Sequence, residues 1–254
     1  MKKIMEFTLR ENRRLNRDMF LLTLCAKDLP EIRPGQFVNV KVEHSPSTFL
    51  RRPISVHDVD PERGLLYLLI KIAGAGTAEL SGLKAGDRLN IVLPLGKGFS
   101  IPAPSERCLL VGGGVGIAPM LHLSREMVKQ GVKPTLLIGV RSATDIVLKE
   151  SFGTYADLYY TTEDGTYGEK GYPTDHSLLR QKFDRIFCCG PEPMMKAVAR
   201  YAYTHRIDCE VSLENMMACG IGACLCCVTE TQAGHKCVCT EGPVMNIKDL
   251  KWQF

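Results

Sequence analysis

Six of the 11 cysteines in this chain lie between Cys219 and Cys239, near the end of its 254 residues. A secreted protein of this length that relies on disulfides would spread its cysteines along the chain. Clustering at one end instead indicates ligation of a metal in a reducing compartment. The last roughly 45 residues are too few to hold a large core, so a metal centre would help this segment to fold.

The spacing of these cysteines indicates the kind of metal centre. Cys219, Cys224 and Cys227 follow the pattern C-x4-C-x2-C, and a fourth cysteine comes later, as in plant-type [2Fe–2S] proteins. Gly220 and Gly222 allow the backbone to come close to a cluster, so that its N–H groups can bond the sulfides and stabilise their negative charge. The pattern therefore predicts an iron–sulfur cluster in this loop.

Two further cysteines leave the ligand set open. Cys226 lies between ligand positions, and Cys237 competes with Cys239 for the fourth one. The alternative is a structural zinc site of Cys224, Cys227, Cys237 and Cys239, which would make the chain a zinc-binding interaction module. Zinc sites usually pair two C-x2-C units, whereas the second pair here is C-x-C and the first cysteine would have no role. The spacing therefore favours the cluster.

A glycine-rich loop indicates a nucleotide site. The apolar run Cys108–Val111 enters this loop, and a helical stretch from Pro119 to about Lys129 follows it. Glycines there permit a tight turn close to a pyrophosphate, and the helix N-terminus favours the anion. Pro119 replaces the third glycine of G-x-G-x-x-G, so the strand–loop–helix context carries the prediction. The candidate nucleotide-binding residues are Gly112, Gly113, Gly114 and Gly116.

Three shorter motifs gain weight from their context. Arg51-Arg52-Pro53 is followed further along the chain by Gly74-Ala75-Gly76-Thr77. An arginine can pair with a phosphate in a bidentate manner, and a helix with Thr77 as its N-cap would offer N–H groups to the same phosphate. Cys189-Gly190-Pro191 ends an expected strand, which is where open α/β sheets bind ligands. Each motif alone is also compatible with an ordinary charge pair, turn or buried cysteine.

The patterning of apolar residues divides the chain into three parts. Residues 1–101 read as short strands between turns, which predicts an antiparallel β-barrel. Residues 102–208 alternate strands with helices, which predicts an α/β domain with a doubly wound parallel sheet. Residues 209–254 form the cysteine-rich unit. The expected strands are Met19–Ala26 (taken as the first), Phe37–Val42, Leu65–Ile72, Leu89–Leu93, Cys108–Val111, Thr135–Val140, Leu158–Thr161 and Arg185–Cys189, and the expected helices are 119–129, 145–152 and 193–205.

Composition and charge exclude several classes of protein. Apolar residues make up 45% and charged residues 24%, so general disorder is excluded. The net charge of +4 comes without a basic run interleaved with aromatics, which argues against nucleic acid as a partner. No stretch approaches ~18 uninterrupted apolar residues, so no membrane span is expected. The chain has neither an H-E-x-x-H motif nor a G-x-S-x-G elbow, and nothing in it supports hydrolysis.

One segment imitates a targeting signal. Arg13-Arg14 precede the apolar run Met19–Ala26, as in a twin-arginine signal peptide. The run is only eight residues long, ends in Lys27-Asp28, and leads to no small-x-small cleavage site. We therefore expect a strand with polar flanks and a cytoplasmic protein.

The motifs, in this order, resemble the ferredoxin–NADP reductase superfamily. There, Arg-Pro-x-Ser and a downstream Gly-Thr hold FAD, and a glycine-rich loop with Cys-Gly-Pro serves the pyridine nucleotide. The cysteine segment narrows the resemblance, because residues 217–224 and 238–244 are similar to the electron-transfer subunits of NAD-dependent, type B dihydroorotate dehydrogenases. Residues 162–175 resemble the same subunits, and the resemblance covers essentially the whole chain.

Carried over position by position, the resemblance implies three sets of site residues. Arg52 would contact the FAD pyrophosphate and Ser55 the region of the flavin ring, while Ile54 stands where the superfamily often has tyrosine. The residues implied for FAD are Arg52, Pro53, Ile54, Ser55, Leu69, Ile70, Lys71, Gly76 and Thr77. Those implied for the pyridine nucleotide are Gly112, Gly113, Gly114, Gly116 and Cys189. The implied cluster ligands are Cys219, Cys224, Cys227 and Cys239.

The resemblance implies electron transfer, with no catalytic acid or base in this chain. Dihydroorotate would be oxidised on a separate FMN-containing catalytic subunit, in a heterotetramer with two copies of each chain, as a step of pyrimidine biosynthesis. Electrons would pass through a [2Fe–2S] cluster and FAD to NAD⁺, so the cofactors do the chemistry and the protein positions them. The alternatives are another oxidoreductase of the superfamily, such as a ferredoxin–NADP reductase or sulfide dehydrogenase subunit, or the zinc-binding module.

A pair of acidic residues indicates which nucleotide is preferred. Glu163-Asp164 follow the strand that begins at Leu158. Carboxylates at this place repel a 2′-phosphate and can accept a hydrogen bond from a free ribose 2′-hydroxyl. The sequence therefore predicts NAD(H) rather than NADP(H).

Overall fold

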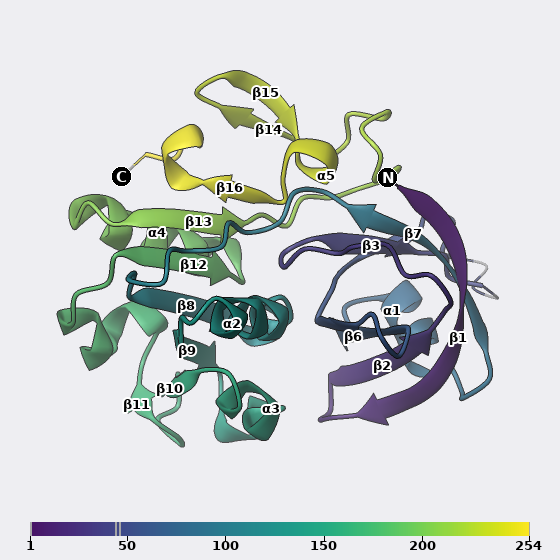
Figure 1. The fold of residues 1–254 in the computed structure, drawn as a ribbon, viewed down its shortest axis with the longest axis horizontal. Helices are drawn as coiled ribbons and strands as arrows, with labels where there is room; N and C mark the ends of the chain where they lie inside the picture. The colour runs from purple at the N-terminus through teal and green to yellow at the C-terminus, as the bar shows by residue number, and fades with distance from the viewer. Residues whose placement is uncertain (1, 44, 46, 254) are drawn as a thin grey trace.

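The computed structural model describes residues 2–43, 45 and 47–253. A curled sheet forms one side of the molecule, a flatter sheet with helices forms the other, and a small C-terminal unit lies across the top of both (Figure 1). No helix within the described residues is long and apolar enough to cross a membrane.

The N-terminal part is an antiparallel sheet of seven strands, as the patterning predicted. Its hydrogen-bonded order is β4-β3-β7-β1-β2-β6-β5, and it curls into a half-barrel. Side chains along β7 alternate between the core and the outside, so that one face of the sheet closes on a buried interior. The elements are β1 (Lys3–Arg14), β2 (Met19–Cys25), β3 (Phe37–Val40), β4 (Arg52–Ser55), β5 (Asp58–Asp60), β6 (Leu65–Lys71), α1 (Ala75–Ser81) and β7 (Arg88–Leu95).

The middle of the chain supplies the predicted parallel, doubly wound sheet. Its strand order is β11-β10-β9-β8-β12-β13, with β16 added antiparallel at one edge. The chain leaves β8 in one direction and returns to β12 on its other side, so the switch point lies between these two strands. The strands are β8 (Cys108–Gly113), β9 (Thr135–Val140), β10 (Asp157–Thr162), β11 (Glu169–Lys170), β12 (Arg185–Cys189), β13 (Asp208–Ser212) and β16 (Val244–Asn246).

Helices cover both faces of this sheet because neighbouring strand residues point to opposite sides. On β8, Leu110 shares a buried cluster with Leu123 of α2, whereas Leu109 shares another with Val198 of α4. The loops at the carboxyl ends of β8 and β12 are left uncovered between these layers. The helices and 3-10 turns are η1 (Gly114–Ile117), α2 (Met120–Lys129), η2 (Ala143–Asp145), α3 (Lys149–Gly153), η3 (Pro173–Asp175), η4 (Ser177–Arg180) and α4 (Glu192–Thr204).

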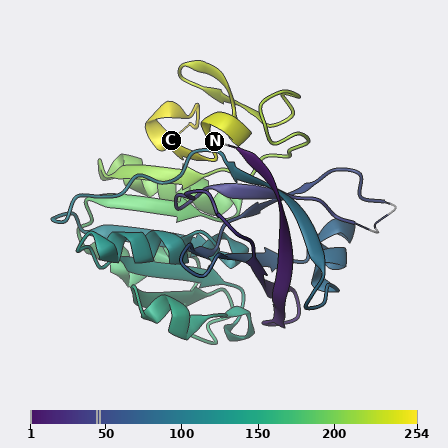
Figure 2. The same cartoon turned by 45° about the vertical axis from the view of Figure 1, so that its right-hand side comes forward.

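The cysteine-rich unit packs against both sheets. Its strand β16 pairs with β13, while its Val238 and Cys239 share a buried cluster with Phe37 and Leu95 of the half-barrel. Figure 2 shows the unit above the junction of the two sheets. Its elements besides β16 are β14 (Val228–Thr231), β15 (Gly234–Cys237), α5 (Val238–Glu241) and η5 (Ile247–Asp249). The division of the chain at residues 101 and 208 stays a prediction.

Two local predictions were wrong. Met19–Ala26 is not the first strand, because β1 precedes it and contains Arg13-Arg14. Among β1 side chains only Phe7 and Leu9 are buried, so the strand has too few apolar residues to be recognised from its sequence. The helix expected over 145–152 is instead the turn η2 followed by α3, because Leu148 between them has the left-handed backbone φ of 55°.

Candidate cofactor sites

A cleft of about 620 Å³ lies where the three units meet, a volume suited to a cofactor. It brings most of the predicted cofactor residues together from strands that are far apart in the chain. From the half-barrel it is lined by Pro53, Ile54, Ser55, Leu69, Ile70, Lys71 and Thr77, and from the parallel sheet by Gly113, Gly114, Gly116 and Cys189. We call it the flavin cleft.

Arg52 and Gly76 lie beside each other next to the lining of this cleft. A Cβ added to Gly76 would come within 3.1 Å of Cδ of Arg52, so the absence of a side chain lets the arginine pack there. Nη2 of Arg52 donates to the Leu50 carbonyl at 2.8 Å. The arginine motif around Arg52 and the glycine motif around Gly76, which were predicted to bind the same phosphate, are therefore adjacent.

Two details of this region differ from expectation. Thr77 is the third residue of α1 and not its N-cap, and its Oγ1 accepts hydrogen bonds from the N–H groups of Ala73 and Gly74 at 2.8 and 3.2 Å. Arg51 turns away from Arg52 and donates to the Asn90 carbonyl at 2.9 Å, so it ties β7 to the loop before β4. Arg51 is therefore structural, and Arg52 remains the candidate phosphate ligand.

Glycines are required after β8 because neighbouring residues at the switch point lie too close to leave room for a Cβ atom. A Cβ on Gly116 would lie 2.3 Å from the Cys189 carbonyl oxygen, and one on Gly113 would lie 2.5 Å from Sδ of Met194. Gly112 is buried against Ile117, where a Cβ would come within 2.7 Å. Gly114 has the left-handed φ of 55°. Gly112 thus shapes the loop without lining the cleft.

A second cleft of about 450 Å³ opens at the carboxyl ends of the parallel strands. We call it the nucleotide cleft. It shares Lys71, Pro191 and the segment 113–115 with the flavin cleft, so the two clefts adjoin. Glu163 and Arg141 line its far part. This is the place at which doubly wound sheets bind nucleotides.

Only one of the two acidic residues at the end of β10 faces the nucleotide cleft. Glu163 lines it, whereas the carboxylate of Asp164 accepts hydrogen bonds from N and Oγ1 of Thr166 at 3.0 and 2.6 Å. These hydrogen bonds hold the pKa of Asp164 below its usual value. Asp164 therefore shapes a turn, and Glu163 is the acidic residue of the pair that lines the cleft.

The segment from Ser212 to Met217 also lines the flavin cleft, which the sequence did not predict. It runs from the end of β13 directly into the cysteine loop, with Met217 two residues before Cys219. Glu214, within this segment, has a pKa raised by burial. No motif in the sequence marked this segment, because its place in the cleft comes from the meeting of β13 with the cysteine loop.

Backbone N–H groups in the cysteine loop are aimed at sulfur. Ile221 and Cys224 both donate to Sγ of Cys219 at 3.4 Å, and these bonds lower the pKa of the Cys219 thiol to about 6. Cys239 donates from its backbone to Sγ of Cys227 at 3.4 Å. N–H groups that point at thiolates stabilise the negative charge of an iron–sulfur cluster, so the loop fits the group the sequence predicted.

The four predicted ligands differ in exposure. Cys227 and Cys239 are buried, Cys219 is half-buried and Cys224 is exposed. Among the described residues their sulfurs do not converge into a preformed metal site, and the spacing remains the basis for the ligand assignment. Cys226 is exposed, and the N–H of Cys237 donates to Glu241 at 3.1 Å.

The half-barrel and the parallel sheet are joined by a polar cluster far from the cysteines. Arg125 of α2 forms an ion pair with Asp58 of β5 at 2.7 Å. Beside it, Nδ1 of His57 donates to the Ala118 carbonyl at 2.7 Å, and burial lowers the pKa of His57 to about 4 and of His122 to about 3. These two histidines are neutral core residues.

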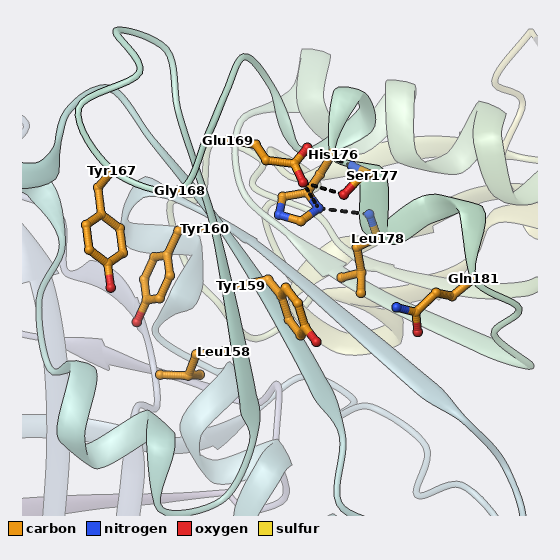
Figure 3. A pocket seen from close by; sticks show the side chains of 10 residues that line it. All are labelled: Leu158, Tyr159, Tyr160, Tyr167, Gly168, Glu169, His176, Ser177, Leu178 and Gln181. Atoms are coloured by element: carbon orange, nitrogen blue, oxygen red, sulfur yellow. Dashed lines mark hydrogen bonds and ion pairs between the residues drawn. The ribbon is translucent and has the colours of Figure 1, made fainter.

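A third hollow, of about 380 Å³, lies at the outer edge of the parallel sheet (Figure 3). Glu169 accepts a hydrogen bond from N of Ser177 at 2.8 Å, and Nδ1 of His176 accepts one from N of Leu178 at 2.9 Å. These polar groups hold the turn η4 in place, and the lining contains no predicted site residue.

Three sequence families match consecutive parts of the chain. Residues 6–99 match the oxidoreductase FAD-binding domain, and residues 110–200 match the oxidoreductase NAD-binding domain. Residues 214–251 match the iron–sulfur cluster binding domain of dihydroorotate dehydrogenase B. The order agrees with that of the two clefts and the cysteine loop.

Curated relatives and solved structures agree with these matches. The chain is 35% identical to the dihydroorotate dehydrogenase B (NAD(+)) electron transfer subunit of Shouchella clausii, over 98% of each chain. It is 39% identical to that of Bacillus velezensis over 85% of this chain and 86% of the relative. A solved NADH-dependent reduced ferredoxin-NADP oxidoreductase superposes with a TM-score of 0.88 at 30% identity, covering 97% of this chain and 90% of that one. The chain belongs to the family of electron transfer subunits of NAD-dependent dihydroorotate dehydrogenase B.

Proposed function

We propose that this chain passes the electrons of dihydroorotate oxidation, received from a separate FMN-containing catalytic subunit, to NAD⁺ by way of one [2Fe–2S] cluster and one FAD. Such cofactors supply the redox chemistry, one carrying single electrons and the other converting them to a hydride. The family membership and the two adjoining clefts support this reading.

The observation that carries the proposal is the continuity between the flavin cleft and the cysteine loop. Met217 and Pro243 line the flavin cleft, and they stand two residues before Cys219 and four residues after Cys239. The loop also rests on the half-barrel, because Nδ2 of Asn39 donates to the Cys219 carbonyl at 3.4 Å. Short covalent links from both ends of the loop keep the two cofactors close, as electron transfer requires.

Each wall of the flavin cleft has a separate task. Arg52 beside Gly76 is placed for the pyrophosphate of FAD, and Ser55 with Ile54 for the flavin ring. Ile54 offers an aliphatic surface in place of an aromatic one, so flavin stacking there is weaker. On the other wall, Cys189 and the glycine loop leave room for a nicotinamide to approach from the nucleotide cleft.

The cysteine loop presents an apolar surface for the catalytic subunit. Met216, Ile221 and Leu225 are 84%, 50% and 63% exposed, and the exposed Cys224 belongs to the same segment of the chain. Exposed apolar side chains grouped in this way are typical of interaction sites. We expect this surface to contact the FMN-containing subunit, in a complex with two copies of each chain. None of the 11 cysteines, all of which the structure describes, forms a disulfide, in agreement with a reducing compartment such as the cytoplasm.

Metal and flavin analysis of the purified full-length chain tests the cofactor assignment. We expect two iron and two acid-labile sulfide per chain, one FAD, and a visible spectrum with both flavin and cluster bands. A colourless protein that contains zinc and no iron would contradict the proposal and favour the zinc-binding module.

A second candidate function is supported by the likeness to the ferredoxin-NADP oxidoreductase structure. In that case the electron donor would be a reduced ferredoxin and not a dihydroorotate-oxidising subunit. Comparing NAD⁺ reduction with each donor separates the two candidates.

A further inference from the structure

Glu214 is the only carboxylate among the described residues that line the flavin cleft. It follows β13, and the backbone around it is fixed on both sides. The N–H of Leu213 donates to the Pro243 carbonyl at 2.9 Å, and Nδ2 of Asn215 donates to the Cys227 carbonyl at 3.4 Å. Glu214 is therefore held between the flavin cleft and the cysteine loop, with its side chain open to the cleft.

The other side chains in the cleft cannot exchange a proton as readily. Lys71 contributes N–H donors, and the serine and threonine hydroxyls are not acids near neutral pH. Burial raises the pKa of Cys189 to about 12, and the neighbouring Glu214 adds to that rise. Cys189 and Lys71 are the other titratable groups that share the described lining with Glu214.

The proposed function creates a need for such a group. A hydride given to NAD⁺ removes two electrons and one proton from the flavin, whereas an iron–sulfur cluster returns two electrons one at a time and no proton. One proton must therefore enter the cleft from water in each turnover, and it must leave again when the electrons flow in the opposite direction.

We propose that the Glu214 carboxyl carries this proton between solvent and the flavin cleft. This inference rests on the proposed function. In the direction of NAD⁺ reduction, the protonated carboxyl gives its proton to the flavin nitrogen as the two electrons arrive, and it is reprotonated from water. In the reverse direction, the carboxylate accepts that proton. Desolvation by the surrounding protein raises the pKa of Glu214 above its usual value.

Two half-reactions of the full-length, cofactor-loaded chain distinguish a proton-carrying role of Glu214 from a role in positioning the nicotinamide or the flavin. Mixing the oxidised protein with NADH transfers a hydride and needs no solvent proton. Mixing the NADH-reduced protein, freed of NAD⁺, with ferricyanide removes electrons singly and requires release of the proton. Stopped-flow absorbance of the flavin reports both rates, in H₂O and in D₂O.

We expect Glu214→Gln to leave the hydride half-reaction within twofold and to slow the ferricyanide half-reaction at least about tenfold. In the unchanged protein the rate of the ferricyanide half-reaction should rise with pH as the carboxylate forms. It should also be slower in D₂O than in H₂O. Glu214→Gln should flatten that pH profile, and Glu214→Asp should restore part of the rate. Glu192→Gln, an exposed carboxylate outside both clefts, is the matched control and should change neither rate.

Equal slowing of both half-reactions by Glu214→Gln would assign the residue to nicotinamide or flavin positioning and would overturn the proposal. An unchanged ferricyanide rate and pH profile would overturn it too. A FAD fluorescence titration shows whether the variants still bind flavin. A chain that binds no flavin at all would instead contradict the proposed function.

Discussion

Backbone N–H groups, rather than charged side chains, prepare the cysteine sulfurs for a metal. Ile221 and Cys224 donate to Cys219, and the backbone of Cys239 donates to Cys227. Gly220, with a left-handed φ of 70°, makes the turn possible, and a Cβ there would strike Nδ2 of Asn39 at 2.7 Å. The loop is therefore specified by glycine geometry as much as by its cysteines.

Serine substitutions test the ligand assignment. Cys219→Ser, Cys224→Ser, Cys227→Ser and Cys239→Ser should each lose most of the iron, because an alkoxide is a poor replacement for a thiolate ligand. Cys226→Ser is the control and should keep the iron. Cys237→Ser should also keep it, and iron-to-protein ratios decide the matter. Loss of iron in Cys237→Ser with retention in Cys239→Ser would reverse the assignment of the fourth ligand.

Glu163 should set the preference for NAD(H). Its carboxylate lines the nucleotide cleft together with Arg141, so removing the negative charge leaves a cation free to attract a 2′-phosphate. We expect Glu163→Gln to raise kcat/KM for NADPH at least about tenfold relative to that for NADH. Asp164→Asn is the comparison, because Asp164 is tied to Thr166 and should change the ratio little. Equal use of both nucleotides by the unchanged protein would contradict the prediction.

Gly116 should tolerate no side chain. A Cβ at this position would overlap the backbone carbonyl of Cys189 at 2.3 Å, and neither strand end can move freely. Gly116→Ala should therefore lower the free energy of unfolding by about 1–3 kcal/mol, as overpacking does. Gly82→Ala is the matched control, since its backbone φ of −88° suits alanine and its nearest neighbour is at 3.4 Å. Urea unfolding compares the two, and equal stability would show that the loop relaxes.

At the scale of elements, one ion pair joins the half-barrel to the parallel sheet. Asp58 of β5 and Arg125 of α2 are both largely buried, and Nη1 of Arg125 also donates to the Val59 carbonyl at 2.7 Å. Removing one charge leaves the other buried without a partner. Arg125→Ala should therefore cost about 3–5 kcal/mol in unfolding free energy.

The double variant Asp58→Asn/Arg125→Ala should recover much of the loss seen in Arg125→Ala, because no unpaired charge remains, and Asp58→Asn is the second single variant. Urea unfolding of the two single variants and the double variant gives the coupling energy. A coupling near zero would mean that the pair contributes nothing to the contact between β5 and α2.

Elements with a strong local pattern were predictable, and those made by tertiary contact were not. Thr135–Val140 and Arg185–Cys189 have the same bounds in the sequence prediction and in the structure, because both are continuous apolar runs buried on two faces. β1 was missed because its charged outer face hides two buried residues. β16 has only three residues, and its pairing with β13 comes from the fold as a whole.

The same distinction holds for the sites. Cysteine spacing and the glycine loop are local sequence signals, so the iron–sulfur segment and the NAD-binding domain, which the family matches confirm, could be predicted. The segment Ser212–Met217 has no motif of its own. It lines the flavin cleft only because β13 and the cysteine loop meet there.

At the scale of the whole molecule, the cysteine-rich unit packs against both sheets above their junction. A Cβ on Gly96 of the half-barrel would lie 2.5 Å from Cδ of Pro243, and Gly242 accepts a hydrogen bond from Lys97. Buried Cys239 belongs to the same apolar cluster as Leu95 and Leu109. Each of the three units thus contributes residues to the lining of the flavin cleft.

The most direct test of this account is NAD⁺ reduction by dihydroorotate, measured with the purified chain alone and with the FMN-containing subunit of a type B enzyme added. We predict no activity from the single chain, although it should pass electrons from NADH to artificial acceptors. Adding the partner should produce dihydroorotate-dependent NADH formation, and Cys224→Ser should reduce that coupled rate far more than it reduces NADH oxidation. Dihydroorotate oxidation by the chain free of any partner, or a coupled rate unaffected by loss of the cluster, would contradict it.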